Sequence, residues 1–523
     1  MSGARAPWSV VLEQLSAVVG PEGLATAEAE RTAYARDLWP RSLLAVQGGD
    51  VAPTPPEVIL WPRTTEQVAE IVKICGAHRV PLVPFGAGSG VCGGAMALRG
   101  GVVLDLKRMR AIRRLEEGVV EVEAGMIGQH LEDALNEAGC TLGHFPSSIW
   151  CSTVGGWLAT RSGGQCSSRY GKIEDMCLSL QVVTGDGVVR ETPMAGALGA
   201  GTMDFNRIFI GSEGTLGVIT AATLKVCPLP QRRLYIAARM PTLDSGLKAM
   251  AAMMQRGVPP AVLRLYDPFD SLFAGHDGGG SSRKSGPLGQ LREAILGASS
   301  TRDAVLKRLL KRPGPINALG KLARKCTLIA VCEGDTTEAG LAMETVKGAL
   351  EAHGAELLGT KPAEAWFAHR HDTGFKQSEL YTAGAFADTF EVATTWSNLV
   401  PLYQAVRSAL SPFGMVMAHF SHAYRGGCSI YFTFVGHAGD PGQNMRRYDA
   451  AWAAALEATA AAGGAIAHHH GVGLARGPAL QRVHGESRRW FDALKATLDP
   501  QGVLNPGKLF DADDVRWGRG GVS

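Results

Sequence analysis

The chain has 523 residues, which is too long for one hydrophobic core, so we expect two or three domains. Hydrophobic residues make up 46% and charged residues 19%, with a formal net charge of +3, as in an ordinary globular protein. No run of 18 apolar residues occurs, which predicts no membrane-spanning helix. The N-terminus lacks the apolar core of a signal peptide, and ten cysteines form no C-x-x-C pair. We therefore expect a cytoplasmic protein with reduced cysteines.

The first 54 residues are predicted to form a helical N-terminal arm, with helices at residues 8–19 and 25–36. A Pro-rich break at Pro53–Pro56 then opens the first folded domain, residues 55–228. Strands and a helix alternate in this domain. That order favours an α+β or α/β fold with a sheet.

Short apolar runs predict the strands of this domain, at residues 58–61, 80–83, 101–106, 119–122, 178–184 and 217–220. Thr64 and Gln67 have the spacing of a capping box, with the threonine as N-cap. This spacing predicts a helix that starts at the Thr64–Gln67 stretch.

A glycine-rich loop, Pro84–Gly94 (PFGAGSGVCGG), follows the second of these strands. Glycine allows left-handed backbone angles and a close approach of a ligand, so consecutive amides can form a nest for a pyrophosphate. A tight surface turn is the alternative. The loop has no Lys-Ser/Thr ending and no GxGxxG spacing, which excludes a Walker loop and disfavours a Rossmann site.

Two further clusters of glycine and hydroxyl residues follow, at Pro146–Gly164 (PSSIWCSTVGGWLATRSGG) and Gly211–Thr220 (GSEGTLGVIT). Their hydroxyls and amides are neutral donors, as a pyrophosphate or a flavin edge would need. Each of the three clusters lies next to a predicted strand. Three independent surface turns would not explain this arrangement.

In order and spacing, these three clusters resemble the flavin domain of the vanillyl-alcohol-oxidase or FAD-linked-oxidase superfamily. The resemblance implies a two-subdomain FAD-binding fold of the vanillyl-alcohol-oxidase type, α+β in class, followed by an α/β cap domain. Pro84–Gly90 contains no histidine or cysteine, so we expect non-covalent FAD. The resemblance implies FAD contacts from Pro84, Phe85, Gly86, Ala87, Gly88, Ser89, Gly90, Ser147, Ser148, Ser152, Thr153, Thr160, Arg161, Ser162, Gly163, Glu213, Gly214, Thr215, Leu216, Gly217, Val218 and Ile219.

We expect the cap domain, with the substrate site, at residues 229–460, and a segment that completes the active site at residues 461–523. Between Arg283 and Lys325 the cap holds eleven basic and two acidic residues, interleaved with apolar ones. Such a basic amphipathic segment can lie on an anionic membrane surface, and a solvated helix face is the alternative. Nucleic acid is disfavoured, because this segment has no aromatic residue to stack on bases.

Two stretches could carry chemistry. AHHHGVG contains three adjacent histidines, His468, His469 and His470, which titrate near neutral pH. If the backbone is extended, the middle histidine faces away from the other two. Exposed histidines or a zinc site are the alternatives, but adjacent histidines rarely supply a full ligand set, so we expect no metal. In the second stretch, Cys428–Phe434, alternation predicts a strand on which Tyr431 faces opposite to its neighbours; such a tyrosine is more often a packing residue than an acid or base.

Together, SHAY…CSIYFTF, AHHHGVG, LDPQGVLNPGKL and ADTFEVATTWSNL resemble the alkyldihydroxyacetonephosphate synthase (alkylglycerone-phosphate synthase) group of that superfamily. The resemblance implies that Tyr431 is a general acid/base, that the three histidines line the active site and that Arg264 binds substrate. At Gln377 the chain departs from the group, which has a substrate-binding arginine there. Lys376 next to it could supply a point charge for the phosphate instead.

The resemblance implies a flavin-dependent enzyme that exchanges the acyl group of acyl-dihydroxyacetone phosphate for a fatty alcohol, with the flavin as an electrophile and no net redox change. It also implies a lipid-like substrate, and it is compatible with a homodimer and with a peripheral position at the inner face of a membrane. One alternative is an FAD-dependent oxidoreductase of a 2-hydroxy acid or alcohol, which the glutamine at position 377 favours. His419 and His422 could then belong to a metal site, but the acidic partner expected near Gly471–Gly473 is absent. Another alternative is a flavoprotein without catalysis.

Overall fold

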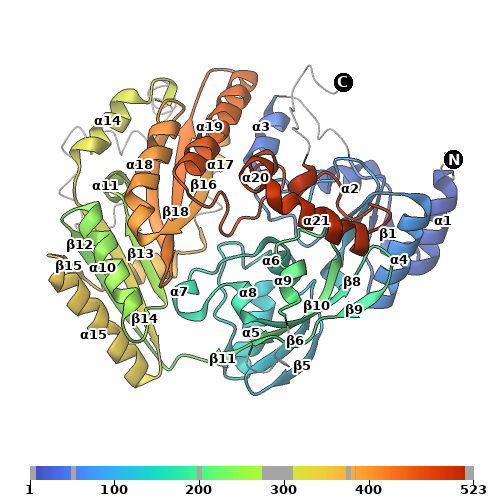
Figure 1. Ribbon diagram of the computed structural model, residues 1–523, viewed down its shortest axis with the longest axis horizontal. Coiled ribbons are helices and arrows are strands. Elements are labelled where there is room, and N and C mark those ends of the chain that lie inside the picture. Colours follow the sequence, from blue (N-terminus) through green and yellow to red (C-terminus); the bar gives the residue numbers. More distant parts are fainter. Residues whose placement is uncertain are drawn as a thin grey trace. The chain divides into compact units, whose positions relative to one another are not determined.

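The computed structural model describes residues 7–48, 55–196, 203–273, 310–372, 378–382 and 384–512, and the chain divides into two compact units (Figure 1). Unit 1 comprises residues 1–163, 171–229 and 469–523. Unit 2 comprises residues 164–170 and 230–468. The N-terminal arm thus belongs to the unit with the glycine clusters. The predicted C-terminal segment is divided, because the chain passes from unit 2 to unit 1 between His468 and His469.

Unit 1 is built on two main sheets. The strands of the first, in spatial order, are β1 (Leu24–Ala25), β2 (Val58–Leu60), β4 (Val102–Asp105) and β3 (Leu82–Phe85). The strands of the second, in spatial order, are β5 (Ile112–Glu116), β6 (Val119–Glu123), β10 (Val218–Lys225), β8 (Cys177–Val183) and β9 (Val189–Glu191). β2, β4 and β3 run parallel, whereas the second sheet is antiparallel throughout. A short pair, β7 (Cys140–Thr141) with β11 (Cys227–Pro228), completes the strands described in this unit.

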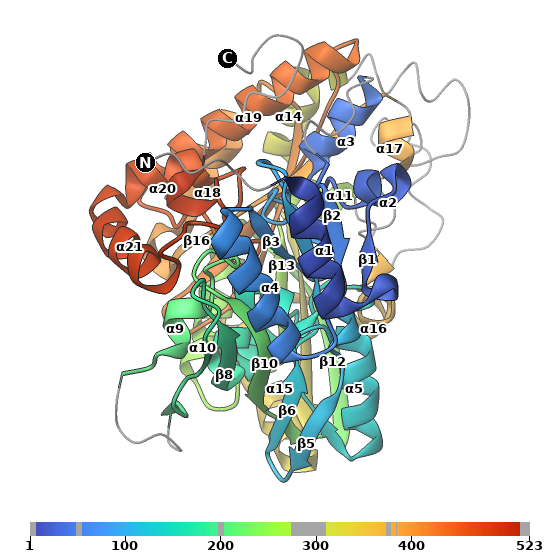
Figure 2. The same ribbon diagram turned by 90° about the vertical axis from the view of Figure 1, so that its right-hand side faces the viewer.

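The helices of unit 1 come from both ends of the sequence. They are α1 (Trp8–Val19), α2 (Glu28–Ala33), α3 (Pro40–Gln47), α4 (Thr65–His78), α5 (Gly128–Glu137), α6 (Val154–Thr160), α8 (Ile173–Met176), α9 (Asn206–Phe209), α20 (Gly477–Val483) and α21 (Gly485–Leu498). Figure 2 shows α1 and α4 side by side, where the Gln67 side chain donates to the carbonyl of Val18 at 2.9 Å. The N-terminal arm therefore packs against α4 and is part of unit 1.

The structure corrects two local expectations in this region. The helix expected at residues 25–36 is only α2, because Leu24 and Ala25 instead extend the first sheet by pairing with β2. At α4 the Thr64 hydroxyl accepts from the amide of Gln67 at 3.3 Å, as predicted. The Gln67 side chain, however, accepts from Arg63 at 2.7 Å, one residue before the cap, so the reciprocal half of the capping box is not formed there.

Unit 2 is built on one seven-stranded antiparallel sheet. Its strands, in spatial order, are β15 (Glu356–Gly359), β12 (Arg232–Met240), β14 (Cys326–Gly334), β13 (Val262–Tyr266), β17 (Met415–Ala423), β18 (Gly427–Gly436) and β16 (Phe386–Thr395). All nine residues of β14 are buried, as expected of a central strand covered on both faces. The mixed helix and strand content expected from the sequence is confirmed in both units.

Helices pack on both faces of the unit 2 sheet. The helices of this unit are α7 (Ser167–Tyr170), α10 (Leu243–Gln255), α11 (Pro268–Phe273), α14 (Gly314–Leu322), α15 (Thr336–Ala352), α16 (Lys361–Ala368), α17 (Ser378–Thr382), α18 (Leu399–Leu410) and α19 (Pro441–Ala461). Helix α16 packs on the face of Tyr266, and α18 and α19 pack on the opposite face. Tyr403 of α18 stacks on Phe432 at 6.0 Å, and Trp452 of α19 meets Phe390 edge-on at 5.1 Å. Because side chains alternate along a strand, the neighbours of these aromatic residues point to the opposite face, where the polar residues of the site lie.

The predicted basic segment 283–325 falls mostly outside the described residues, which resume at residue 310 with the stretch that leads into α14. Its proposed contact with a membrane surface stays a prediction. Among the helices of the described residues, none combines the length and the apolar character that a membrane crossing requires.

Candidate active site

The three glycine clusters meet inside unit 1. Gly86 of the first cluster lies against Thr153 of the second, and Gly214 of the third lies against Pro84 of the first. The amide of Glu213 donates to the carbonyl of Ala159 at 3.0 Å, which joins the third cluster to the second. Loops that lie far apart in the sequence therefore line one region of this unit, as the sequence predicts.

Glycine is required sterically at these junctions. A Cβ at Gly86 would overlap the Thr153 hydroxyl, which itself caps α6 by accepting from the amide of Gly156 at 3.2 Å. At Gly214, φ is +74° and a Cβ would lie 2.9 Å from the Pro84 ring. The glycines allow the three loops to approach one another closely, and glycine loops of this kind can form a nucleotide-binding cradle.

Gly86→Ala should reduce the cofactor content of the purified protein, because the new methyl group must displace Thr153 or the loop itself. The absorbance of bound cofactor per mole of protein measures this effect. Thr153→Ala removes the overlapping hydroxyl at the cost of the α6 cap, about 1 kcal/mol. The double variant should therefore recover part of the lost cofactor; equal losses in the single and double variants would contradict the steric account.

The predicted cofactor residues all lie in unit 1. Pro84 and Phe85 end β3, Thr153 caps α6, and Arg161 ends α6 in a left-handed conformation with φ +55°. Val218 and Ile219 begin β10. Thr160 is the last residue of α6, and the other members lie in the loops that join these elements, at residues 86–90, 147–152, 162–163 and 213–217. Their predicted contacts with the cofactor stay predictions.

Glu213 has an additional role that the sequence did not indicate. Its carboxylate is buried and accepts from the amides of Val472 and Gly473, the latter at 2.9 Å. Asn505 donates to the carbonyls of Glu213 and Gly94, at 2.7 and 3.0 Å. Burial raises the pKa of Glu213, while the two amide donors oppose the rise. Glu213 thus fixes the loop that follows the histidine triple to the glycine clusters of unit 1.

In unit 2, four polar or aromatic residues form a row across adjacent strands. The pairing register places Glu391 opposite Tyr431, Tyr431 opposite His419, and His419 opposite Tyr266. The rings of His419 and Tyr431 are stacked at 4.7 Å with an interplanar angle of 24°. Ile430 and Phe432 are fully buried on the other face, which confirms the predicted facing of Tyr431.

Tyr431 is a protonated phenol at neutral pH, and its environment disfavours the phenolate further. Burial raises the pKa of Tyr431 to about 12, against a hydrogen bond from Thr389 and the charge of Arg264, which both lower it. The positive charge of Arg264 stabilises the phenolate, so the pKa of Tyr431 is lower than burial alone would make it.

Arg264 is placed beside this row. Its guanidinium lies over the rings of Tyr266, at 5.1 Å, and Trp366, at 5.4 Å, and its Nη2 donates to Nδ1 of His419 at 3.1 Å. An arginine only donates, so Nδ1 of His419 must accept, and the imidazole is neutral with its hydrogen on Nε2. A cation and a neutral imidazole donor next to a phenol form a site suited to an anionic substrate.

Two acidic side chains, Asp267 and Asp270, lie near this row. Asp267 is 0% exposed and accepts from Arg407 at 2.6 Å and from Tyr403 at 2.8 Å. Asp270 lies in the first turn of α11, which begins directly after Asp267. Its Oδ2 is 3.9 Å from Nδ1 of His419. Burial and the charge of Asp267 raise the pKa of Asp270 to about 8.

Asp270→Asn should flatten the pH dependence of stability. Because the folded chain holds the Asp270 proton up to about pH 8, the unfolded chain loses this proton first, and the free energy of unfolding falls as pH rises from about 4 to about 8. The variant should lack this decrease in the free energy of unfolding, which is at most about 1.4 kcal/mol per pH unit. Urea unfolding at pH 5, 6, 7 and 8 measures the slope, with the exposed Asp244→Asn as control. An unchanged slope in the Asp270 variant would contradict the assignment.

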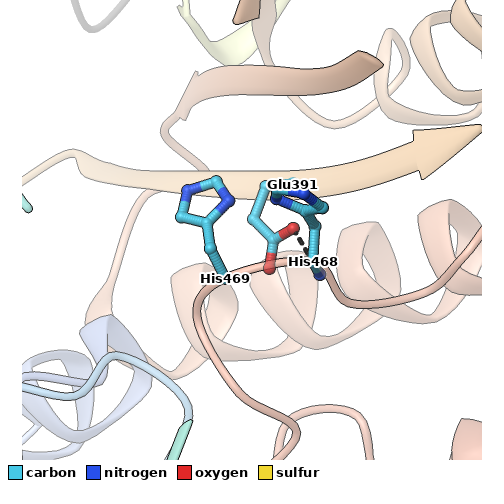
Figure 3. A group of neighbouring side chains, drawn as sticks. All are labelled: Glu391, His468 and His469. Carbon is cyan, nitrogen blue, oxygen red and sulfur yellow. Dashed lines mark hydrogen bonds between the residues drawn. The ribbon is translucent and has the colours of Figure 1, made fainter. Parts of the chain in front are cut away.

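His468 is held against the edge of the unit 2 sheet. Ala465 pairs with Ala393 of edge strand β16, and the His468 amide then donates to the buried carboxylate of Glu391 at 2.8 Å (Figure 3). The triple is not an extended strand, since residues 468–470 form bends. His469, the next residue in Figure 3, begins unit 1, where its ring contacts that of His470 at 4.4 Å.

Glu391, His468 and His469 are residue types that bind metal ions, and they form one such candidate group. The expectation that the chain holds no metal stays a prediction. Lys376 and Gln377, which were predicted to contact the phosphate, lie outside the described residues.

Sequence reasoning missed Thr389, Glu391 and Tyr266 on the polar face of the unit 2 sheet, and it considered His419 and His422 only as metal ligands. A signal was available for two of them. In the stretch ADTFEVATT, Thr389 and Glu391 alternate with apolar residues, as on a strand with one polar face.

Two family models match the chain. The model "FAD binding domain" matches residues 56–193, and the model "FAD linked oxidases, C-terminal domain" matches residues 229–509. The first match covers two of the three glycine clusters, and the second covers the whole polar face of unit 2.

Curated relatives include enzymes of two kinds. The chain is 30% identical over 495 residues to an alkyldihydroxyacetonephosphate synthase of Trypanosoma brucei brucei, covering 91% of this chain and 75% of the relative. It is 29% identical to the Dictyostelium discoideum protein of the same name, covering 95% and 80%. It is also 28% identical to glycolate oxidase subunit GlcD of Bacillus subtilis, covering 96% and 97%.

Solved structures share the fold. An alkyldihydroxyacetonephosphate synthase structure superposes with a TM-score of 0.74 at 24% identity, covering 97% of this chain and 86% of the other. A substrate-bound p-cresol methylhydroxylase superposes with a TM-score of 0.70 at 18% identity, covering 97% of both chains. These similarities confirm the predicted fold of the vanillyl-alcohol-oxidase type.

Proposed function

The chain belongs to the FAD-linked oxidase family, and from this premise we propose that it is an alkyldihydroxyacetonephosphate synthase-like enzyme. It would exchange the acyl group of acyl-dihydroxyacetone phosphate for a fatty alcohol. The observation that carries the proposal is the position of Tyr431 beside Arg264 and His419 on one face of the unit 2 sheet. A phenol for proton transfer and a cationic group for phosphate are the two elements that this reaction needs.

FAD is the cofactor of this family, and the residues of unit 1 fit it. Gly86 and Gly214 leave no room for a Cβ, so the backbone of the three loops can approach a bound pyrophosphate. Hydroxyls and amides supply neutral donors along the same loops. When bound, FAD would supply an electrophilic ring for carbon–oxygen bond exchange.

Arg264 would anchor the phosphate of the substrate. Its guanidinium lies over the rings of Tyr266 and Trp366, and an arginine can make a bidentate contact with a phosphate. His419, with its hydrogen on Nε2, would add a neutral donor next to this charge. If Lys376 contributes as well, it does so as a point charge.

Tyr431 would remove and return the proton at C1 of the anchored substrate. Its resting form is the phenol, and burial raises the pKa of Tyr431 to about 12. The fraction of phenolate therefore increases with pH across the neutral range, and so should the rate of a step in which Tyr431 acts as base. The histidine triple would orient the transfer and stabilise the departing carboxylate.

A second candidate is an FAD-dependent oxidoreductase of a 2-hydroxy acid or alcohol. The similarity to glycolate oxidase subunit GlcD, at 28% identity over 97% of that protein, favours it. Arg264 would then hold a carboxylate in place of a phosphate. Membrane contact through residues 283–325, a homodimer and a cytoplasmic location stay predictions under either candidate.

Anaerobic absorbance spectra distinguish the two candidates. The FAD-loaded protein is mixed without oxygen with palmitoyl-dihydroxyacetone phosphate and hexadecanol, and separately with a panel of 2-hydroxy acids. The proposal predicts that the flavin spectrum is oxidised after turnover with the lipid pair and is not bleached by any hydroxy acid. Bleaching by a single hydroxy acid at catalytic rates would support the oxidoreductase instead.

A further inference from the structure

The N-terminal arm contacts the first glycine cluster of unit 1 at both of its ends. Residues 34–39 form the connection between α2 and α3. The ring of Tyr34 lies 4.9 Å from that of Phe85, where the cluster begins. Near the other end, a Cβ added to Gly93 would lie 2.9 Å from the ring of Trp39. This connection is therefore part of the surroundings of the predicted pyrophosphate loop.

The loop of this cluster is held by its carbonyl groups. The amide of Leu38 donates to the carbonyls of Gly88 and Gly90, at 3.1 and 2.9 Å. One residue pair earlier, Nζ of Lys107 donates to the carbonyl of Gly86 at 2.8 Å. Three alternate carbonyls of the loop thus accept from donors that lie outside it.

These contacts set the direction of the loop amides. The peptide bonds here are trans, so the carbonyl of one residue and the amide of the next point in opposite directions. The amides of Ser89 and Val91 therefore point away from Leu38. Within the described part of the chain, no amide of residues 87–91 donates to a protein group. Gly88, with φ +63°, supplies the left-handed residue that a nest of amides contains.

Asp37 shapes the turn from which the arm reaches the loop. Its carboxylate is 2% exposed and accepts from the amide of Trp39 at 3.1 Å, as in an Asx-turn. Burial raises the pKa of Asp37 to about 7, while the amide of Trp39 and the charge of Lys508 oppose the rise. The amides of Gly93 and Ala95 act in the same direction, so they lie near enough to stabilise the carboxylate. Asp37 thus links the turn of the arm to the far end of the glycine cluster.

We propose that Asp37 and Leu38 are positioning residues of the cofactor site, although they lie in the N-terminal arm. They hold the loop by its carbonyls, so that the amides of Ser89 and Val91 stay available to the pyrophosphate of FAD. The loop is then ordered before the cofactor binds, which reduces the entropic cost of binding. This role concerns the binding of FAD and not the reaction, so it applies to a synthase and to an oxidoreductase alike.

A comparison of flavin release with unfolding tests this role. The FAD-loaded protein is heated while flavin fluorescence reports release and circular dichroism reports unfolding. Asp37→Ala removes the acceptor that shapes the turn, and Leu38→Pro removes the amide that holds two carbonyls of the loop. Both variants should release flavin at a lower temperature relative to unfolding than the native chain, and their dissociation constants for FAD should rise about tenfold or more. Leu38→Ala is the matched control and should behave as the native chain, because it keeps the amide and the Leu38 side chain is 54% exposed.

Hydrogen exchange of the native chain is a second test, and it needs no variant. Coupling between two equilibria is reciprocal, so FAD must stabilise the arm if the arm stabilises the FAD site. Removal of FAD should speed amide exchange about tenfold or more in a peptide of residues 34–39 and leave α15 of unit 2 unchanged. Unchanged exchange in the arm, native FAD affinity in both variants, or flavin release that shifts together with unfolding would overturn the proposal. Neither test uses a substrate, so failure of the proposed reaction does not affect either result.

Discussion

Tyr431→Phe should lower turnover by about 10²–10⁴-fold, the usual effect of removing a general acid or base, while the protein still binds FAD. The substitution removes one hydroxyl from a ring that remains stacked on His419 at 4.7 Å, so the sheet should not change. The readouts are the rate of product formation and the spectrum of bound flavin.

The matched control lies on the opposite face of the same sheet. Tyr448 of α19 donates to Asp388, which Trp452 also contacts at 2.9 Å. Tyr448→Phe should therefore lower stability by about 1–3 kcal/mol and leave turnover per folded molecule unchanged. Native turnover of Tyr431→Phe, or an equal loss of activity in the two variants, would contradict the role of Tyr431 as a general acid/base.

Arg407→Ala should reduce the free energy of unfolding by about 3–5 kcal/mol, the largest effect on stability that we expect from a single substitution. The Asp267 carboxylate, 0% exposed, would keep neutral donors such as Tyr403 and the Asp270 amide but would lose the charge of Arg407. Burial already raises the pKa of Asp267, and the charge of Arg407 works against this rise. Denaturant unfolding near neutral pH measures the loss.

Two variants test the cause of that loss. Arg407→Met combined with Asp267→Asn removes both charges and should recover most of the stability, because a buried pair is often no better than a neutral replacement. Lys248→Ala breaks an ion pair whose side chains are 65% and 59% exposed, and should change the free energy of unfolding by less than about 1 kcal/mol. A double variant as unstable as Arg407→Ala would show that the charge of Asp267 is not the cause.

Elements with a strong local pattern were predictable from the sequence. The strand Cys428–Phe434 and the opposite facing of Tyr431 follow from strict alternation of side chains, and the structure confirms both. The glycine clusters were predictable as neighbours because three loops of the same unusual composition each adjoin a strand. The helix expected at residues 25–36 was wrong in its extent, because pairing of Leu24 and Ala25 with β2 is a contact between distant residues that local propensity does not encode.

Partners of individual side chains could not be predicted in the same way. The cofactor contact of Glu213 stays a prediction, and its sequence position gave no sign that its carboxylate accepts from the amides of Val472 and Gly473, some 260 residues away. A β-bulge at His422 in β17 depends on a one-residue mismatch between two strands, which only their pairing reveals. The split of the histidine triple between the units likewise follows from tertiary contacts of His468 with β16.

The most direct test of the central claim is product analysis with the native chain. FAD-loaded protein is incubated with palmitoyl-dihydroxyacetone phosphate and hexadecanol, and the lipid products are identified by mass spectrometry. The account predicts hexadecyl-dihydroxyacetone phosphate together with free palmitate in equal amounts. A protein with a normal spectrum of bound FAD that forms no ether product would contradict it.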